Sequence, residues 1–526
     1  MSTESNIRDI RLQKLARLRD LGLDPYRVEK FERNVGATDV HDRYAELEGT
    51  SVRFAGRVVS YRLMGKAGFA HISDGDGRVQ GYFRKDDLTE SEWEAYNLLD
   101  IGDHVGVEGE VFATKTGEKS IHVRKLVPLS KALHVLPLGK EKDGQQWYGL
   151  SDVETRYRHR HLDLICNPTA RRMLIQRMKV VSSVRRFFDQ HGYLEVETPV
   201  LQLEAGGAAA RPFLTHHNAL DIDMKLRISL ELYLKRLICG DLPKVYEIGR
   251  VFRNEGISSR HNPEFTLLEF YEAYANLEDM MTVVEELFRH VALEVFGSAV
   301  VEIRADHTHS PEAVAHRLDF SKPWRRVSLL DEIERHTGLS GDDLSDLDRA
   351  VARSRQLDVP GKARAAGAAI DLDTEANLGG YIEKLLEVFV EPTLQEPTFV
   401  VGYPVETSPL AKKDPENPRM TRRFEGYVLG REVCNAFSEI NDPLDQRERF
   451  EKQVSERAKG DDEAHPMDEE FLYALECGMP PTGGCGIGID RLAMILTGAE
   501  HIREVVLFPT MRPEAGPSDQ RNEEDD

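Results

Sequence analysis

The chain has 526 residues, of which 40% are hydrophobic and 30% charged, with 40 glycines and 24 prolines. This composition excludes a fibrous or wholly disordered chain. No apolar run approaches the ~20 residues needed to cross a bilayer, and residues 1–23 lack the apolar core of a secretion signal. We therefore expect a cytoplasmic protein with at least two domains.

Net charge and cysteine usage further narrow the class of protein. The net charge of −22 argues against indiscriminate binding to a polyanion. Acidic and basic residues nearly balance in residues 1–150, so this part is the better platform for a nucleic acid. The five cysteines include no CxxC pair, so we expect free, mostly buried thiols and no structural zinc.

The N-terminal part predicts a helix followed by a small β-barrel. Apolar residues recur at helical spacing in residues 7–21, with basic residues between them, and Gly22 ends the pattern. Five short alternating segments with intervening turns lie between residues 52 and 128, with one helical stretch at 88–99. This order fits an OB-type barrel, which often binds single-stranded nucleic acid but in many proteins is only a scaffold.

The rest of the chain predicts one large α+β unit behind a connector. We expect a helical extension at 1–48, the barrel at 49–133, a linker at 134–155 and the large unit at 156–513. Within that unit, residues 340–395 are rich in Ala, Asp and Leu and predict an inserted helical bundle. Residues 514–526 hold six acids and one arginine, which predicts a disordered tail.

Residues 245–253 and 265–271 predict neighbouring strands with charge on a buried face. The second strand presents Phe265, Leu267, Glu269 and Tyr271 on one side. An ionised glutamate on such a face needs a cation near it. The first strand and the loop after it supply Arg250, Arg253, Glu255, Arg260 and His261. Arginine forks suit the phosphates of a nucleotide, while a cross-strand Arg–Glu pair is the simpler alternative and explains one arginine.

Residues 424–428 and 431–439 predict a hairpin of similar character. Asn435, Phe437 and Glu439 share one face, whereas Glu432 has the opposite parity and needs a β-bulge to reach the same site. Glu425 and Glu432 together are a candidate pair of Mg²⁺ ligands against phosphates. Solvated carboxylates are the alternative.

Residues 480–491 form a glycine-rich turn into a helix. Asp490 is expected to cap this helix, and Arg491 lies in its first turn. Arginine is unfavourable at that end of the helix dipole, and a bound anion would offset this. An ordinary glycine-rich turn with a solvated arginine is the alternative. The spacing matches neither a dinucleotide-binding fingerprint nor a P-loop.

These segments resemble the three signatures of class II aminoacyl-tRNA synthetases, and the sequence is identified as a member of the lysyl-tRNA synthetase family. Residues 193–199 predict a strand that ends in proline, and residues 192–199 resemble the first signature. Residues 252–265 resemble the second signature and residues 486–491 the third. Segments 206–213, 231–236 and 435–442 resemble the lysyl branch in particular. The resemblance runs from about residue 7 to 513, barrel included.

The resemblance implies an α+β fold, with a five-stranded OB-fold barrel that binds the anticodon and a class II catalytic domain whose antiparallel sheet is flanked by helices. It implies a homodimer formed through the region around Pro199. The implied reaction joins L-lysine and ATP to lysyl-adenylate and pyrophosphate, and then transfers lysine to the 3′-terminal ribose of tRNA(Lys). Mg²⁺ is the implied cofactor.

The resemblance also implies a role for individual residues. The ATP site would contain Arg253, Glu255, His261, Phe265 and Arg491, with the two arginines catalytic. The lysine site would contain Gly207, Glu231, Glu269, Tyr271, Asn435, Phe437 and Glu439. Glu425 and Glu432 would bind Mg²⁺, and Arg62, Phe69, Gln80 and Glu118 would read the anticodon. The helix at 7–21 would add a basic face for the tRNA.

Three alternatives remain beside this interpretation. An aspartyl- or asparaginyl-type synthetase has the same architecture, but the acidic set Glu231, Glu269 and Glu439 favours a cationic amino acid. A catalytically silent paralogue would tolerate loss of the arginines and carboxylates of the ATP site, yet this sequence retains all of them. An enzyme that modifies a protein with lysine would have no use for the barrel.

Overall fold

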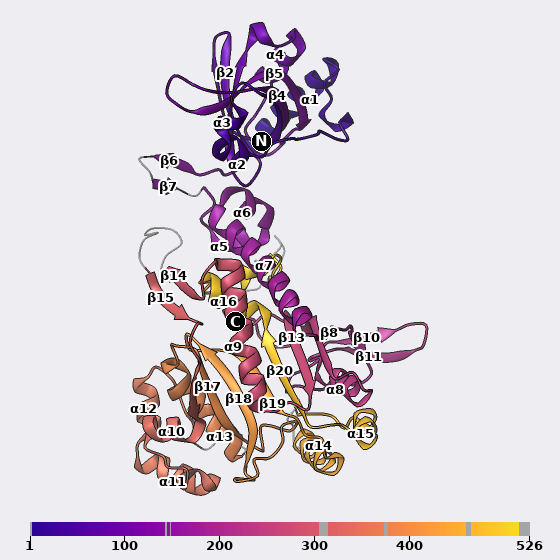
Figure 1. Ribbon diagram of the computed structural model, residues 1–526, viewed down its shortest axis with the longest axis vertical. Coiled ribbons are helices and arrows are strands. Elements are labelled where there is room, and N and C mark those ends of the chain that lie inside the picture. The colour runs from indigo at the N-terminus through magenta and orange to yellow at the C-terminus, as the bar shows by residue number, and fades with distance from the viewer. Residues whose placement is uncertain are drawn as a thin grey trace, which may run out of the picture. The chain divides into compact units, whose positions relative to one another are not determined.

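The computed structural model describes residues 3–142, 145–147, 149–304, 314–372, 377–458 and 464–514. The chain forms two compact units, residues 1–171 and 172–526 (Figure 1). The predicted disordered tail lies outside the described residues, apart from Glu514. Among the described helices, none is long and apolar enough to span a membrane.

The first unit contains the expected five-stranded closed barrel. Its strands are β1 (Ser51–Met64), β2 (Ala67–Ser73), β3 (Arg78–Arg84), β4 (His104–Ala113) and β5 (Lys119–Ser130), in the spatial order β1-β2-β3-β5-β4. Alternate residues point inward, as the burial pattern of β2 shows, and they form one apolar core. Helix α4 (Glu90–Asn97) packs on this core, and a capping box from Thr89 begins it.

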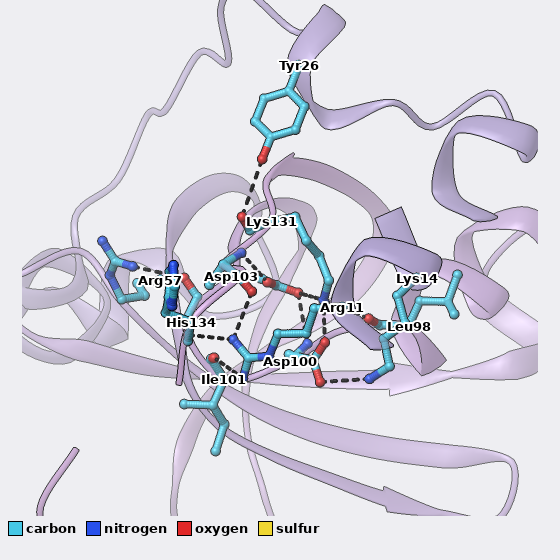
Figure 2. Close-up of polar contacts among 12 residues, drawn as sticks. Arg11, Lys14, Tyr26, Arg57, Leu98, Asp100, Ile101, Asp103, Lys131 and His134 are labelled. Carbon is cyan, nitrogen blue, oxygen red and sulfur yellow. Dashed lines mark hydrogen bonds and ion pairs between the residues drawn. The ribbon is translucent and has the colours of Figure 1, made fainter. Parts of the chain in front are cut away.

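Helix α1 (Thr3–Asp20) is fixed to the barrel through its basic residues (Figure 2). Arg11 is 6% exposed and donates to the carbonyls of Ala132 and His134 at 2.8 and 2.7 Å. Lys14 pairs with Asp100 at 2.7 Å, and Arg17 pairs with Glu94 at 2.6 Å. Acceptors of the same unit therefore already bind three basic side chains of the helix that was expected to add a basic face for the tRNA.

A buried ion pair lies beside the Arg11 contacts (Figure 2). The Lys131 side chain at the end of β5 is 1% exposed, and its Nζ lies 2.5 Å from Asp100 Oδ2 and 2.7 Å from Asp103 Oδ2. Asp103 also accepts hydrogen bonds from the Ala132 and Asp100 N–H groups. The buried charges are thus paired on several sides, which such groups require.

Short elements complete the first unit. They are η1 (Pro25–Arg27), α2 (Ala37–Asp42), α3 (Tyr44–Leu47), η2 (Lys85–Asp87), the hairpin β6 (Lys140–Lys142) and β7 (Gln145–Trp147), α5 (Val153–Arg158) and α6 (Arg160–Cys166).

The second unit is built on an eight-stranded sheet. Its spatial order is β16 (Arg325–Ser328), β17 (Thr398–Pro404), β18 (Met420–Val428), β19 (Arg431–Ser438), β20 (Thr482–Gly488), β13 (Glu264–Ala273), β12 (Lys244–Phe252) and β8 (Leu194–Glu195). Neighbours are antiparallel except in the pairs β16–β17 and β12–β8. The predicted α+β fold with a mostly antiparallel sheet is confirmed.

The two faces of the sheet have different neighbours because the side chains alternate. Leu268 and Phe270 of β13 pack into a core with α7 (Pro168–Gln190), α9 (Leu277–Phe296) and α16 (Ile489–Thr497), which lie together on one side (Figure 1). Leu267 and Tyr271 of the same strand point the other way. That face meets α8 (Glu231–Cys239), α14 (Pro443–Ala458) and α15 (Glu469–Glu476).

The helices between β16 and β17 have a core of their own. They are α10 (Leu329–Thr337), η3 (Asp343–Ser345), α11 (Leu347–Gln356), α12 (Val359–Ala365), α13 (Leu378–Leu385), η4 (Leu386–Val390) and η5 (Glu391–Thr393). Smaller elements of the unit are the three-stranded sheet β9 (Leu201–Gln202), β10 (Leu214–His217) and β11 (Ile222–Leu226), the hairpin β14 (Val300–Arg304) and β15 (Val314–Asp319), and α17 (Ile502–Val505).

Two local expectations are wrong. The strand expected at 193–199 is reduced to the two residues of β8, because the Thr198 N–H donates to the Glu247 carboxylate at 3.1 Å and Pro199 has no N–H. Asp490 does not cap α16, whose N-cap is Gly488. Asp490 instead accepts a 2.8 Å hydrogen bond from the Thr266 N–H and pairs with Arg177.

All five cysteines are free. Cys166, Cys434 and Cys485 are buried, as expected, whereas Cys477 is exposed.

Candidate active site

A cavity of about 1200 Å³ opens on the face of the second unit's sheet that carries Leu267 and Tyr271. The central strands β13, β18, β19 and β20 supply much of its lining. Every residue predicted to bind ATP, lysine or Mg²⁺ lines it: Gly207, Glu231, Arg253, Glu255, His261, Phe265, Glu269, Tyr271, Glu425, Glu432, Asn435, Phe437, Glu439 and Arg491. The sequence pattern therefore converges on one site.

Three carboxylates meet at one end of the cavity. Glu231, Glu269 and Glu439 are 6%, 5% and 1% exposed. Burial raises the pKa of each of them. Burial and the charge of Glu231 together raise the pKa of Glu269 to about 7. For Glu439, the same two effects outweigh the opposing effect of Lys235 and raise the pKa to about 8. This end of the cavity is therefore suited to a cation.

The three carboxylates differ in how many hydrogen bonds they already accept. Glu269 Oε1 accepts from Ser229 Oγ at 2.8 Å and from the Leu230 N–H at 3.2 Å, while Oε2 accepts from the Tyr271 hydroxyl at 3.2 Å. Apart from an ion pair with Lys235, both oxygens of Glu439 are buried without a partner among the described residues. An orphaned buried carboxylate requires a donor from a ligand.

Two glycines make room at this end. Gly207 has φ +89°, and a Cβ there would lie 2.8 Å from Ser229 Oγ. Its N–H donates to His465 Nε2 at 2.5 Å, and burial lowers the pKa of His465 to about 4, which keeps the accepting ring neutral. At Gly484, a Cβ would lie 2.1 Å from Glu439 Oε1 and 2.4 Å from the Tyr271 ring.

The cavity lining also carries two arginines of the proposed ATP site. Among the described residues Arg253 forms no ion pair, its guanidinium lies 5.2 Å from the centre of the Phe265 ring, and burial lowers its pKa. Arg491 pairs with Glu432 at 2.7 Å, and that carboxylate raises the pKa of Arg491. Its guanidinium also lies 3.3 Å from His261 Nε2, and burial followed by the charge of Arg491 lowers the pKa of His261. Two guanidiniums and an aromatic ring are suited to a nucleotide.

Glu425 and Glu432 reach the same cavity through the β-bulge that the sequence requires. The register of β18 and β19 shifts between the pairs Gly426–Cys434 and Tyr427–Glu432, so Val433 is the extra residue. Glu425 accepts from the Tyr403 and Tyr427 hydroxyls at 2.9 and 2.6 Å and pairs with Arg423. The extra residue turns Glu432 to the side on which Glu425 lies.

Several residues of the site were not assigned a role from the sequence. Arg423 is 8% exposed and donates to Glu425 and to Asn435 Oδ1, so it joins the carboxylate pair to the amino-acid end. Lys235 lies inside a motif of the family resemblance, but only its contacts with Glu231 and Glu439 reveal its position. Arg250 lies outside the cavity lining and pairs with Glu264 at 3.4 Å, which is the cross-strand alternative.

The residues predicted to read an anticodon lie together on the barrel. Arg62 on β1 pairs in register with Phe69 on β2, and Phe69 stacks on Tyr82 of β3 with ring centres 5.0 Å apart. Gln80 Nε2 donates to Glu118 Oε2 at 2.8 Å, which fixes the amide orientation. The group has a ring for stacking and polar edges beside it.

Comparison with known proteins agrees with this arrangement. One family profile, tRNA synthetases class II (D, K and N), matches residues 152–512, and another, OB-fold nucleic acid binding domain, matches residues 52–129. The chain is 50% identical to the lysine–tRNA ligase of Syntrophomonas wolfei subsp. wolfei over 97% of each chain. It is 49% identical to that of Moorella thermoacetica, over 98% of this chain and 99% of the relative, and 46% identical to that of Bacillus subtilis, over 96% of each. The chain belongs to the class II tRNA synthetases of the D, K and N group.

Proposed function

We propose that this chain is a lysine–tRNA ligase. It activates L-lysine with ATP to lysyl-adenylate, releases pyrophosphate, and transfers lysine to the 3′-terminal ribose of tRNA(Lys). The observation that carries this function is the set of three buried carboxylates, Glu231, Glu269 and Glu439, in a cavity that two arginines also line.

The carboxylates favour lysine over the other amino acids of the group. Aspartate would bring a further negative charge beside three buried acids, and the side chain of asparagine would add no cation to that of Lys235. The ε-ammonium of lysine has three N–H donors, and Glu439 is the partner without hydrogen bonds. Of the cations at this end, Lys235 already pairs with Glu231 and Glu439, and Arg423 pairs with Glu425 at 2.5 Å.

The first step is attack of the lysine carboxylate on the α-phosphorus of ATP. Arg253 would bind the α-phosphate and the attacking carboxylate, and Arg491 the γ-phosphate, exchanging Glu432 for the phosphate. Phe265 would stack on the adenine, and Glu255 and His261 would line the nucleotide. The rate gain comes from positioning and charge neutralisation, since no protein nucleophile is required.

The second step is attack of the terminal ribose hydroxyl of the tRNA on the lysyl carbonyl of the adenylate, which forms the ester and releases AMP. Phe69 would stack a splayed anticodon base, and Arg62, Gln80 and Glu118 would read base edges. Reading the anticodon explains why the chain carries a complete barrel.

Mg²⁺ fits the carboxylates on β18 and β19. Burial and the charges of Glu425 and Glu432 raise the pKa of nearby Glu391 to about 7, which indicates unbalanced negative charge. The described residues contain no group of three or more ligating side chains, so the phosphates of ATP would complete the coordination of the ion. When bound, Mg²⁺ would neutralise charge on the phosphates.

We further propose a cytoplasmic homodimer. Large apolar side chains are exposed on β8–β11 and the adjoining loops, namely Leu194, Val200, Leu201, Leu203, Leu214 and Leu220. Exposed apolar side chains gathered in one segment are typical of a subunit interface.

Amino-acid-dependent ATP–pyrophosphate exchange tests the function. The assay is run with each standard amino acid in turn, with Mg²⁺ and without tRNA. We expect exchange with lysine and charging of tRNA(Lys) when tRNA is added. Exchange with aspartate or asparagine alone would refute the specificity, and no exchange by folded protein would point to a silent paralogue.

A further inference from the structure

Lys235 lies beneath the amino-acid end of the cavity, and the reaction steps above give it no role. Its side chain is 0% exposed, and its Nζ lies 2.5 Å from Glu231 Oε1 and forms an ion pair with Glu439. Burial favours the neutral amine, but the two carboxylates outweigh this and raise the pKa of Lys235. The protein therefore keeps an internal ammonium between two carboxylates that are proposed to recognise the substrate.

The charges at this end balance only when a substrate with two ammonium groups is counted. When all three are ionised, Glu231, Glu269 and Glu439 bring three negative charges, and Lys235 brings one positive charge. L-Lysine supplies an α- and an ε-ammonium, while its carboxylate would meet Arg253. An amino acid with a neutral side chain would leave one buried negative charge unpaired, which is costly.

Lys235 also determines which carboxylate oxygens remain for a ligand. It binds Glu231 Oε1, four residues earlier on α8, and it pairs with Glu439 Oε2 beyond the end of β19. The other oxygen of Glu439 is buried and accepts no hydrogen bond from the described residues. The three donors to Glu269, in contrast, already occupy both of its oxygens.

We propose that Lys235 is a positioning and specificity-determining residue, which holds Glu231 and Glu439 so that they receive a single substrate ammonium between them. This inference rests on the proposed function, because it takes the ε-ammonium of lysine as the group received. Lys235 acts through the two carboxylates. It makes the site selective for a side chain that ends in an ammonium group.

A different role for the same contacts is a structural tie between α8 and the end of β19. Loss of a purely structural tie would destabilise the fold and weaken the binding of lysine and ATP alike. Loss of a positioning residue would weaken lysine binding alone, with a dependence on pH. The difference arises because, without Lys235, Glu231 and Glu439 would hold protons up to a higher pH than in the unaltered protein, and lysine must displace those protons.

The groups that act on Lys235 or on its two carboxylates come from several elements. They are Glu231 and Cys239 on α8, Glu269 and Tyr271 on β13, Arg423 on β18, Cys485 on β20, Glu439 after β19 and His465 before α15. Only Glu231 and Glu439 lose their cation when Lys235 is replaced.

Lys235→Met tests the proposal, because methionine keeps the length of the side chain without its charge. The matched control is Arg236→Met on the same helix, where the arginine pairs with the exposed Glu470 at 3.7 Å. The KM values for lysine and ATP and the value of kcat are measured by ATP–pyrophosphate exchange from about pH 6.5 to about pH 9. Thermal unfolding of the full chain is followed in parallel.

For Lys235→Met we expect the KM for lysine at neutral pH to rise at least about tenfold, the cost of displacing a proton whose pKa lies one unit higher. The excess should shrink as the pH rises, while the KM for ATP stays near that of Arg236→Met. An unchanged KM for lysine would overturn the proposal. Equal rises in the KM values for lysine and ATP, without pH dependence, would also overturn it.

A second pair of variants keeps the proposal falsifiable if Lys235→Met does not fold. Lys235→Met/Glu439→Gln removes one charge of each sign and is compared with Glu439→Gln. The proposal requires the double variant to bind lysine more weakly at neutral pH, because Glu231 has lost its cation; equal KM values would refute it. If the unaltered protein itself does not activate lysine, the proposed function fails instead.

Discussion

Glu269 and Glu439 hold protons at pH values where the unfolded chain has lost them. Their pKa values are about 7 and about 8 in the folded protein, against an ordinary value of 4.5. At pH values between the ordinary pKa and the raised pKa values, the folded state binds more protons than the unfolded chain. The free energy of unfolding of the ligand-free protein should therefore fall as the pH rises. Bound lysine would replace the protons with an ammonium.

The first prediction is that lysine binds more tightly as the pH rises from about 6 to about 8, by up to about tenfold per pH unit for each proton released. Isothermal titration in buffers of different ionisation enthalpy would count the protons. Glu439→Gln should lower that count. An affinity for lysine that does not change with pH would contradict the assignment of these carboxylates.

The second prediction concerns the glycine beside Glu439. Gly484→Ala places a Cβ 2.1 Å from Glu439 Oε1 and 2.4 Å from the Tyr271 ring, so both side chains must move. We expect the KM for lysine to rise at least about tenfold, as when substrate-positioning groups are displaced. Gly486→Ala is the matched control, because its Cβ would meet only Glu269 Cγ and the Asn435 carbonyl at 3.6 and 4.0 Å. Equal lysine KM values in the two variants would contradict this geometry.

At the scale of elements, α1 is joined to the barrel through charges that are buried or partly buried (Figure 2). Arg11 and Lys14 of α1 bind the segment 100–134, and Lys131 crosses beneath them to Asp100 and Asp103. The order of α1 and the integrity of the barrel are therefore coupled.

The third prediction is that Lys131→Met lowers the stability of the first unit by about 3–5 kcal/mol, because it leaves buried carboxylates without their cation. Lys14→Met is the control and should cost less than about 1 kcal/mol, since that pair is partly exposed. Urea unfolding of the full chain would show an earlier first transition for Lys131→Met. ATP–pyrophosphate exchange should persist at urea concentrations below that transition, since the amino-acid site lies in the other unit. Simultaneous loss of the exchange activity and of the folded first unit would contradict the prediction.

The elements also show what sequence alone determines. Alternation along β13 correctly predicted that Phe265, Glu269 and Tyr271 face one cavity, because a strand repeats every two residues. The parity of Glu432 predicted the bulge, but not that Val433 forms it. The strand at 193–199 was overestimated, since the Glu247 side chain takes the Thr198 N–H. The contacts of Lys235 and Arg423 join residues on different elements, which periodicity does not reveal.

On the scale of the whole molecule, the exposed leucines around β8–β11 support the proposed homodimer. Leu214 and Leu220 are 77% and 64% exposed in the single chain. The fourth prediction is that the protein has twice the chain mass of 59.6 kDa in solution, and that Leu214→Asp shifts it toward monomer. Light scattering after size exclusion measures both. Leu444→Asp is the control, because Leu444 is 76% exposed on α14; a monomeric unaltered protein would contradict the dimer.

The residues proposed to recognise the substrates are divided between the two units. The larger unit carries the cavity and every residue proposed to contact ATP or lysine, and the smaller unit carries the stacked rings of Phe69 and Tyr82. Family membership follows from both, since the profiles match 152–512 and 52–129 separately.

The extra residue at Val433 has a consequence for how the gene tolerates change. Along the hairpin of β18 and β19, losing the codon of Val433 would leave the remaining pairs in register and the turn intact, and Glu432 and Asn435 would then be separated by two positions. A regular strand places such residues on one face, so both side chains would still face the cavity. The loss of this one codon should therefore straighten the hairpin without turning Glu432 away from the site.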